Sequence, residues 1–229
     1  FERVAAQDPG NLMVAVRLAV SHSLLGRDEE ALRWFRRAEG IDGESLDLRH
    51  YLGQHHLRAG RFEQAAPLLE AVVAAAPQRL PALEGLARVR ERQGRLDEAA
   101  ALVERLVALD RAPAAELLRL GELRMAAGRT AQAIAAFERA RALQGEAFNR
   151  HLELGVLYLA DRRLAEAAVA LDRVPPGHPG YPMALFKRAQ VSVLLGEPDR
   201  GERVRRATAH ADATTAPLIA RETLFADRR

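Results

Sequence analysis

The residues of this chain whose types best suit chemistry are its histidines, three of which lie within two turns of one expected helix. These are His50, His55 and His56. Zinc on a helix is usually held by side chains three or four residues apart, because these share one face. The three histidines are spaced by five, six and one, so they do not fit this geometry. We interpret the rings as packing groups, and we expect no metal site and no cofactor.

Motifs for nucleophilic or phosphate chemistry are also lacking. The chain has no phosphate-binding loop, no G-x-S-x-G and no H-E-x-x-H. Its serines are Ser21, Ser23, Ser45 and Ser192, and none has a recognisable nucleophile context. There is no cysteine, which excludes disulfides and thiolate metal sites. The sequence therefore predicts a protein that is not an enzyme.

The charges of the chain nearly balance. It has 34 basic and 31 acidic residues, for a formal net charge of +3. All the lysines and arginines except Lys187 are arginines, which hardly titrate and so give a high isoelectric point to a nearly neutral chain. No long run of like charge occurs, so nucleic acid is not the expected partner. No apolar run approaches the roughly 20 residues of a membrane span, so we expect no membrane insertion.

The elements that would position any site follow a repeat of 34 residues that needs no insertion or deletion. One series of small residues is Ala19, Gly53, Ala87, Gly121, Gly155 and Ala189, and a second is Ala31, Ala65, Ala99, Ala133, Ala167 and Gly201. Leucine precedes the first series at Leu18, Leu52, Leu86, Leu120 and Leu154. Glycine recurs at Gly26, Gly60, Gly94, Gly128 and Gly196, where a helix would end on a left-handed residue.

Each repeat predicts two amphipathic helices joined by a short turn. Within 114–147, four leucines form a 3.6-residue stripe before Gly128, and a second apolar stripe follows it. The small residues would let the two helices approach closely, whereas the larger ones would fill the seam to the next pair. Because one pair cannot bury both its faces, the pairs must stack. The expected fold class is therefore all-α.

This pattern resembles the tetratricopeptide repeat (TPR) family. The family has leucine and a small residue in the first helix, glycine at the turn, then alanine and a large apolar residue in the second helix, with proline at the end. One repeat shows all of these at Leu52, Gly53, Gly60, Ala65, Leu69 and Pro77. The resemblance covers nearly the whole chain. It implies a right-handed α-α superhelix, a solenoid of antiparallel helix hairpins.

The register of the repeat predicts the domain organisation. The expected units are 12–45, 46–79, 80–113, 114–147, 148–181 and a degenerate sixth at 182–215. Residues 1–11 fit the second half of a preceding unit, so we expect the chain to be cut from a longer protein. At the other end we expect a capping helix over 216–229, capped by Thr215 and carrying Leu218, Ile219, Leu224 and Phe225.

The resemblance also implies where a partner binds. In TPR proteins the first helices line a concave groove, and certain of their positions contact the ligand. Carried over to this sequence, the main positions are Val16, Val20, His50, Gln54, Glu84, Arg88, Glu91, Leu118, Glu122, Leu152, Val156, Phe186 and Gln190; Met13 and Asp47 are among the others. This lining would be charged in the middle and apolar towards both ends. It favours an amphipathic helix or an extended segment with apolar anchors over an acidic chaperone tail.

Three functions remain open on the sequence. The leading one is a scaffold that binds a peptide or partner domain through the groove, with His50, Gln54, Arg88 and Glu91 setting its orientation. The second is a non-catalytic accessory domain of a larger, enzymatic protein, and the third is RNA binding. Self-association is left open. The compartment is not determined, with cytoplasm as the default, and the bias towards arginine suggests a bacterial genome.

Overall fold

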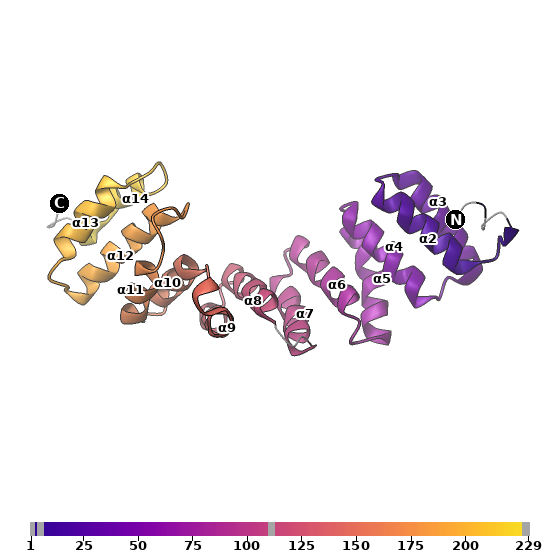
Figure 1. Ribbon diagram of the computed structural model, residues 1–229, viewed down its shortest axis with the longest axis horizontal. Helices are drawn as coiled ribbons and strands as arrows, with labels where there is room; N and C mark the ends of the chain where they lie inside the picture. The colour runs from indigo at the N-terminus through magenta and orange to yellow at the C-terminus, as the bar shows by residue number, and fades with distance from the viewer. Residues whose placement is uncertain (1–2, 4–6, 110–112, 226–229) are drawn as a thin grey trace. The chain divides into compact units, whose positions relative to one another are not determined.

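A computed structural model describes residues 3, 7–109 and 113–225 of the chain, and its elements there are helices joined by turns (Figure 1). The helices are α2 (Leu12–Leu24), α3 (Asp28–Asp42), α4 (Leu46–Arg58), α5 (Phe62–Ala75), α6 (Leu80–Arg92), α7 (Leu96–Leu109), α8 (Ala114–Ala126), α9 (Thr130–Gln144), α10 (His151–Ala160), α11 (Leu164–Asp172), α12 (Tyr181–Leu195), α13 (Arg200–Ala209) and α14 (Ala216–Arg221). Two short 3-10 helices, η1 (Gly145–Ala147) and η2 (Thr223–Phe225), complete the set. The all-α fold class is confirmed, and the described residues contain no strand.

The chain forms two compact units, Phe1–Glu116 and Leu117–Arg229, with the boundary inside α8. In the first unit, α2 pairs with α3, α4 with α5 and α6 with α7. In the second, α10 pairs with α11 and α12 with α13. Each sequence range expected to hold a hairpin contains two of these helices. The division into 34-residue units itself stays a prediction.

The small residues of the repeat lie where the helices of a hairpin touch. Ala31, Ala65 and Ala99 are fully buried. A Cβ atom added at Gly53 would lie 2.9 Å from Cγ of Leu69, which belongs to the second helix of the same hairpin. Close packing of this kind excludes a larger side chain without displacement of the neighbour.

The turns of the hairpins depend on a left-handed residue after the first helix. Gly26, Gly60, Gly94 and Gly128 have φ between 71° and 73°. After each of them the next N–H donates back to the helix, as Arg129 does to the carbonyl of Arg124 at 2.8 Å. The turn between α10 and α11 has the same backbone, but its left-handed residue is Arg162, with φ of 62°.

The segment after α13 differs from the expected capping helix. It forms a six-residue helix, α14, and then η2, so Leu224 and Phe225 lie outside the helix. Thr215 does not cap α14 with its side chain: its hydroxyl donates to Oδ1 of Asp212 at 2.8 Å and accepts from the N–H of Asp212 at 3.0 Å. The carboxylate of Asp212 attracts the hydroxyl away from the helix end. Residues 226–229 lie outside the described residues.

Two further expectations concern the beginning of the chain and membranes. Most of 1–11 lies outside the described residues, and the described Pro9 accepts a hydrogen bond from Arg37 through its carbonyl at 3.1 Å. None of the described helices combines the length and the apolar character that crossing a bilayer requires.

Candidate functional site

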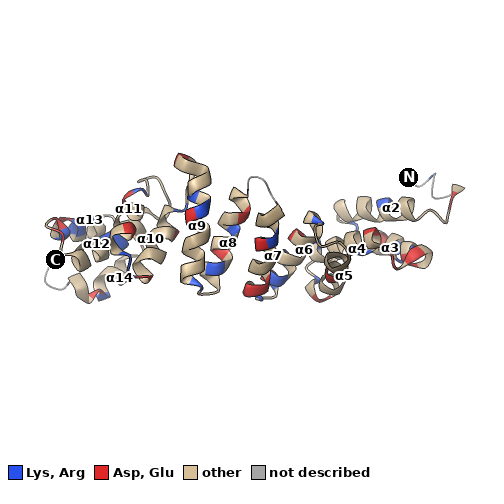
Figure 2. Cartoon of the chain, turned by 90° about the horizontal axis from the view of Figure 1, so that it is seen from below, with Lys and Arg blue, Asp and Glu red and all other residues tan. Residues whose placement is uncertain are grey.

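The predicted groove positions of the first unit lie on the first helices of its hairpins. α4 contacts both α2 and α6, so these three helices stand side by side. We call their exposed surface the first-helix face: it is formed by Met13, Arg17, Val20, Asp47, Tyr51, Gln54, Glu84, Arg88 and Glu91. Arginines and acidic residues both occur on α4 and α6, whereas α2 carries one arginine and no acidic residue (Figure 2).

A pocket opens on the first-helix face between α2 and α4. It has a volume of about 330 Å³ and is lined by Met13, Val16, Arg17, Val20, Ser21, Asp47 and Tyr51. The lining residues of α2 lie three or four positions apart, because these spacings keep side chains on one side of a helix. We call this concavity the α2–α4 pocket.

Towards α6 the face carries charged side chains. Asp47 is paired with Arg79, whose Nη2 lies 2.7 Å from Oδ1 of Asp47. Glu84 and Arg88 are exposed on successive turns of α6 and form no ion pair with any other described residue. Glu84 and Arg88 are therefore one acidic and one basic group that have no ion-pair partner in the described part of the chain and can contact a ligand.

The predicted residues of the first unit do not all reach this surface. Val16 is only 2% exposed, because it packs in the seam with Leu48 of the neighbouring first helix. His50 is also buried. Gln54 is half-buried, and its Nε2 donates to the carbonyl of Pro81 at 2.9 Å, so it holds α4 against α6. Val20 is partly accessible, and Glu84, Arg88 and Glu91 are exposed.

In the second unit the corresponding face of α12 is covered by α14 and η2 and the residue between them. Phe186 is buried, and its ring meets that of Phe225 edge-on with centroids 5.9 Å apart. Gln190 donates to the carboxylate of Glu222. Ile219 belongs to the same apolar cluster. The chain thus occupies, with its own residues, positions of α12 that were predicted to bind a partner.

The other predicted positions of the second unit are partly accessible. Leu118, Leu152 and Val156 are half-buried, and Glu122 is exposed. Oε1 of Glu122 lies 2.9 Å from Nη2 of Arg150, which precedes α10. This pair fixes the start of α10 against α8. The role of these four residues in binding a partner stays a prediction.

A polar cluster that sequence reasoning missed joins the first two hairpins and places a serine, a histidine and an aspartate in contact. Oγ of Ser23 lies 2.7 Å from Nδ1 of His55, and Nε2 of His55 lies 3.1 Å from Oδ1 of Asp28. Nη2 of Arg61 is 2.7 Å from that same Nε2. Nε2 of His55 thus lies between a guanidinium, which can only donate, and a carboxylate, which can only accept, and Nη2 of Arg58 donates to Oγ of Ser23 at 2.6 Å.

The surroundings of His55 favour its neutral form. Burial lowers the pKa of His55, and the charge of Arg61 lowers it further, which favours the neutral ring. Arg61 also binds both carboxylate oxygens of Asp28, at 2.8 and 2.9 Å. The cluster therefore ties two turns together.

His56 belongs to the same cluster and has the most strongly shifted histidine pKa. Burial, reinforced by the charge of Arg61, lowers the pKa of His56 to about 4. Nε of Arg61 donates to Nδ1 of His56 at 2.9 Å, so protonation at that nitrogen would break this hydrogen bond. The neutral ring is the form that the folded chain requires.

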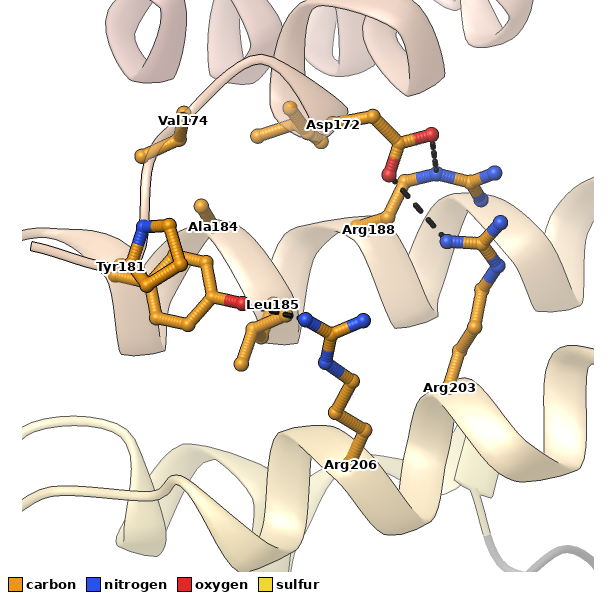
Figure 3. A pocket seen from close by; sticks show the side chains of 10 residues that line it. Asp172, Val174, Tyr181, Ala184, Leu185, Arg188, Arg203 and Arg206 are labelled. Carbon is orange, nitrogen blue, oxygen red and sulfur yellow. Dashed lines mark hydrogen bonds and ion pairs between the residues drawn. The ribbon is translucent and has the colours of Figure 1, made fainter. Parts of the chain in front are cut away.

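The densest group of arginines lines a second pocket, of about 190 Å³, between the end of α11, α12 and α13 (Figure 3). Arg188 and Arg203 both reach Asp172, and Arg206 donates to the hydroxyl of Tyr181 at 2.6 Å. The acidic partners in this group are Asp172, Glu197 and Asp199. Arg188 and Arg203 thus share Asp172 and Glu197 as ion-pair partners, whereas Arg206 is held by a neutral hydroxyl. Arg188 is buried here because its charge is paired, and we interpret the group as structural.

Two residues of the first-helix face were missed by the sequence analysis. Arg17 and Tyr51 line the α2–α4 pocket but stand outside the family's ligand positions. Arg17 lies four residues after Met13 and four before Ser21, so helical periodicity alone places all three on one side. Which side faces the next hairpin could not be read from that periodicity.

Comparisons with known proteins agree with the fold. A model of the tetratricopeptide repeat family matches residues 52–116 and 118–182, which together make up more than half of the chain. A search of curated proteins found no sequence that matches it. Many solved structures do match.

Three of the matching structures cover most of this chain. YrrB, described as a TPR protein with an unusual peptide-binding site, has a TM-score of 0.66 at 15% identity, over 82% of this chain and 98% of its own. The MamA protein has a TM-score of 0.61 at 22% identity, over 73% and 92%. PilF of Pseudomonas aeruginosa has a TM-score of 0.58 at 18% identity, over 94% and 98%. At these identities the likeness concerns the fold.

Proposed function

Because the chain belongs to the tetratricopeptide repeat family, we propose that it is a protein-interaction scaffold whose first-helix face binds an extended segment of a partner protein. Glu84 and Arg88 would set the orientation of that segment, and Met13 and Val20 would contact its apolar side chains. The chain itself would carry out no reaction and need no cofactor.

One difference between the two units carries this proposal. In the second unit the face of α12 is occupied by Phe225 and Glu222 of the same chain. In the first unit, residues on the equivalent surface stay exposed: Met13 is 51% exposed, and Glu84 and Arg88 lack ion-pair partners among the described residues. A surface with apolar and charged groups that nothing in the described chain covers is suited to a ligand.

The dimensions of the face limit what it can hold. Packed helices lie about 8–10 Å apart, so α2, α4 and α6 together span roughly 20 Å. An extended chain advances about 3.3 Å per residue, so the face can accommodate about six residues of a peptide. The YrrB structure supports this reading, since that protein has the same fold and a peptide-binding site.

The signs of the charges favour a protein over a nucleic acid. Single-stranded RNA is bound by grooves that present many cations to its phosphates. The first-helix face instead presents Asp47, Glu84 and Glu91 beside Arg17 and Arg88. A peptide with side chains of both signs matches this surface better than a uniformly charged backbone.

Photocrosslinking tests where the partner lies. A benzophenone amino acid replaces Arg88 on α6, or Arg36 on the exposed side of the second helix α3 as a matched control. Both variants are expressed in the cells that make the protein and irradiated. We expect a specific crosslinked protein from position 88 and none from position 36. The proposal fails if position 36 crosslinks the same protein equally, or if position 88 yields only RNA.

A further inference from the structure

We propose that the α2–α4 pocket binds a large apolar side chain of the partner segment and that Arg17 binds a carboxylate beside it. The preferred ligand of this end of the first-helix face is then a segment in which a bulky apolar residue adjoins an acidic one. This inference rests on the proposed function and specifies the chemistry of its partner.

The apolar half of the argument comes from the walls of the pocket. Met13, Val16 and Val20 of α2 and Tyr51 of α4 line it, and of these Val16 is buried. Its volume of about 330 Å³ leaves room for a side chain such as leucine or phenylalanine. Met13 is 51% and Tyr51 37% exposed, and both would lose apolar surface to water when such a side chain enters.

The argument for a carboxylate ligand comes from Arg17 and Asp47, the two charged residues that line the pocket. Asp47 is held by Arg79 at 2.7 Å. Arg17 is exposed and makes no hydrogen bond through its side chain and no ion pair with any other described residue. The hydroxyl of Ser21 donates to the backbone carbonyl of Arg17 at 2.8 Å and so does not engage its guanidinium. Among the described residues, the charge at the pocket that lacks an ion-pair partner is therefore positive.

The geometry of α2 places Arg17 beside the apolar residues of the pocket. Arg17 follows the buried residue Val16 directly and lies one turn from Met13. A guanidinium can bind both oxygens of a carboxylate, which gives direction to the contact. A ligand residue in the pocket thus has its neighbour within reach of Arg17, and an acidic neighbour is favoured over a neutral or basic one.

Peptide selection tests this pairing with the whole 229-residue chain. Random short peptides displayed on phage are selected against the wild-type chain, Arg17→Glu, and the control Arg36→Glu. We expect the wild type and Arg36→Glu to enrich peptides with an apolar–acidic pair. Arg17→Glu should enrich peptides in which the acidic residue is replaced by a basic one.

The enriched peptide then allows a double-mutant cycle. Replacing its acidic residue by the corresponding amide, or replacing Arg17 by glutamine, should each weaken binding about fivefold, as expected for an exposed ion pair. The two changes together should weaken binding no further than either one alone. Circular dichroism verifies that each variant is folded.

The contrary outcomes separate the two proposals. If the peptides bind with dependence on Arg88 but Arg17→Glu enriches the same sequences as the wild type, the inference about the pocket is wrong and the proposed function stands. If no peptide is enriched, or if the enriched peptides are insensitive to both Arg17→Glu and Arg88→Glu, both proposals are overturned.

Discussion

Replacement of Arg162 by glycine should stabilise the chain, although arginine is the better helix former. Arg162 is the left-handed residue of the turn between α10 and α11, with φ of 62°, where the other turns of this type have glycine. The hydrogen bonds of the turn are already formed: the N–H of Arg163 donates to the carbonyl of Tyr158 at 2.8 Å. The substitution therefore changes the cost of the backbone conformation and leaves the turn intact.

The expected gain is the difference between two backbone effects. A left-handed conformation costs an L-residue about 1–2 kcal/mol that glycine does not incur. Glycine in turn loses more freedom on folding, which offsets roughly 0.5–1 kcal/mol. The side chain of Arg162 is exposed and has no partner among the described residues, so its removal costs little. The net gain is about 0–1.5 kcal/mol, or a rise of up to about 6 °C in the unfolding midpoint for a chain of this length.

Thermal unfolding followed by circular dichroism measures this gain, and hydrogen exchange at α10 and α11 places it. Arg162→Ala is the control, because alanine removes the guanidinium but keeps a Cβ and so keeps the strain. Gly128→Arg, at a turn with φ of 72°, should destabilise the chain by a similar amount. The reasoning is refuted if Arg162→Gly lowers the midpoint, or if Arg162→Ala raises it as much.

Three other predictions follow from the packing and the titrating groups. As the pH falls from 6.5, the ordinary pKa of a histidine, towards about 4, His56 is protonated in the unfolded chain but stays neutral in the folded chain, so the free energy of unfolding decreases in this window. His56→Gln should reduce this decrease, as measured by urea unfolding at pH 7 and pH 4.5. Ala99→Leu, at a fully buried position of α7, should cost about 1–3 kcal/mol by overpacking, while Ala101→Leu on the exposed side of the same helix should be nearly neutral. Phe225→Ala should expose the face of α12 and destabilise that region by about 3–5 kcal/mol. Hydrogen exchange in α12 should become faster, and an apolar dye should bind there. Unchanged exchange in α12 would contradict the covering contact.

The sequence predicted the hairpins because their requirements are local and repeat in phase. A left-handed turn needs glycine, and close contact of two helices needs a small residue such as Gly53 or Ala65, so residue types alone reveal both. Arg162 shows the limit of this reading, since the residue type gives no sign of its backbone conformation. Its place in the repeat, 34 residues after Gly128, could have revealed it.

The surface was less predictable because it depends on side-chain partners that are distant in the sequence. The pairing of Arg61 with Asp28 bridges two hairpins and brings Arg61 to Nε2 of His55. The burial of Val16 depends on how closely α2 approaches α4. The covering of Phe186 by Phe225 depends on the direction that the chain takes after α13. None of these follows from the repeat register.

The most direct test of the central claim is the affinity of the crosslinked partner for a chain in which two charges of the first-helix face are exchanged. Glu84→Arg with Arg88→Glu keeps the net charge and changes only the order of the signs on α6. Arg36→Glu with Glu39→Arg makes the matching exchange on α3. By isothermal titration calorimetry we expect the α6 exchange to weaken binding about tenfold or more, because like charges then face each other, and the α3 exchange to leave it unchanged. Equal affinities for the wild type and the α6 exchange, or equal losses in both exchanges, would contradict the account.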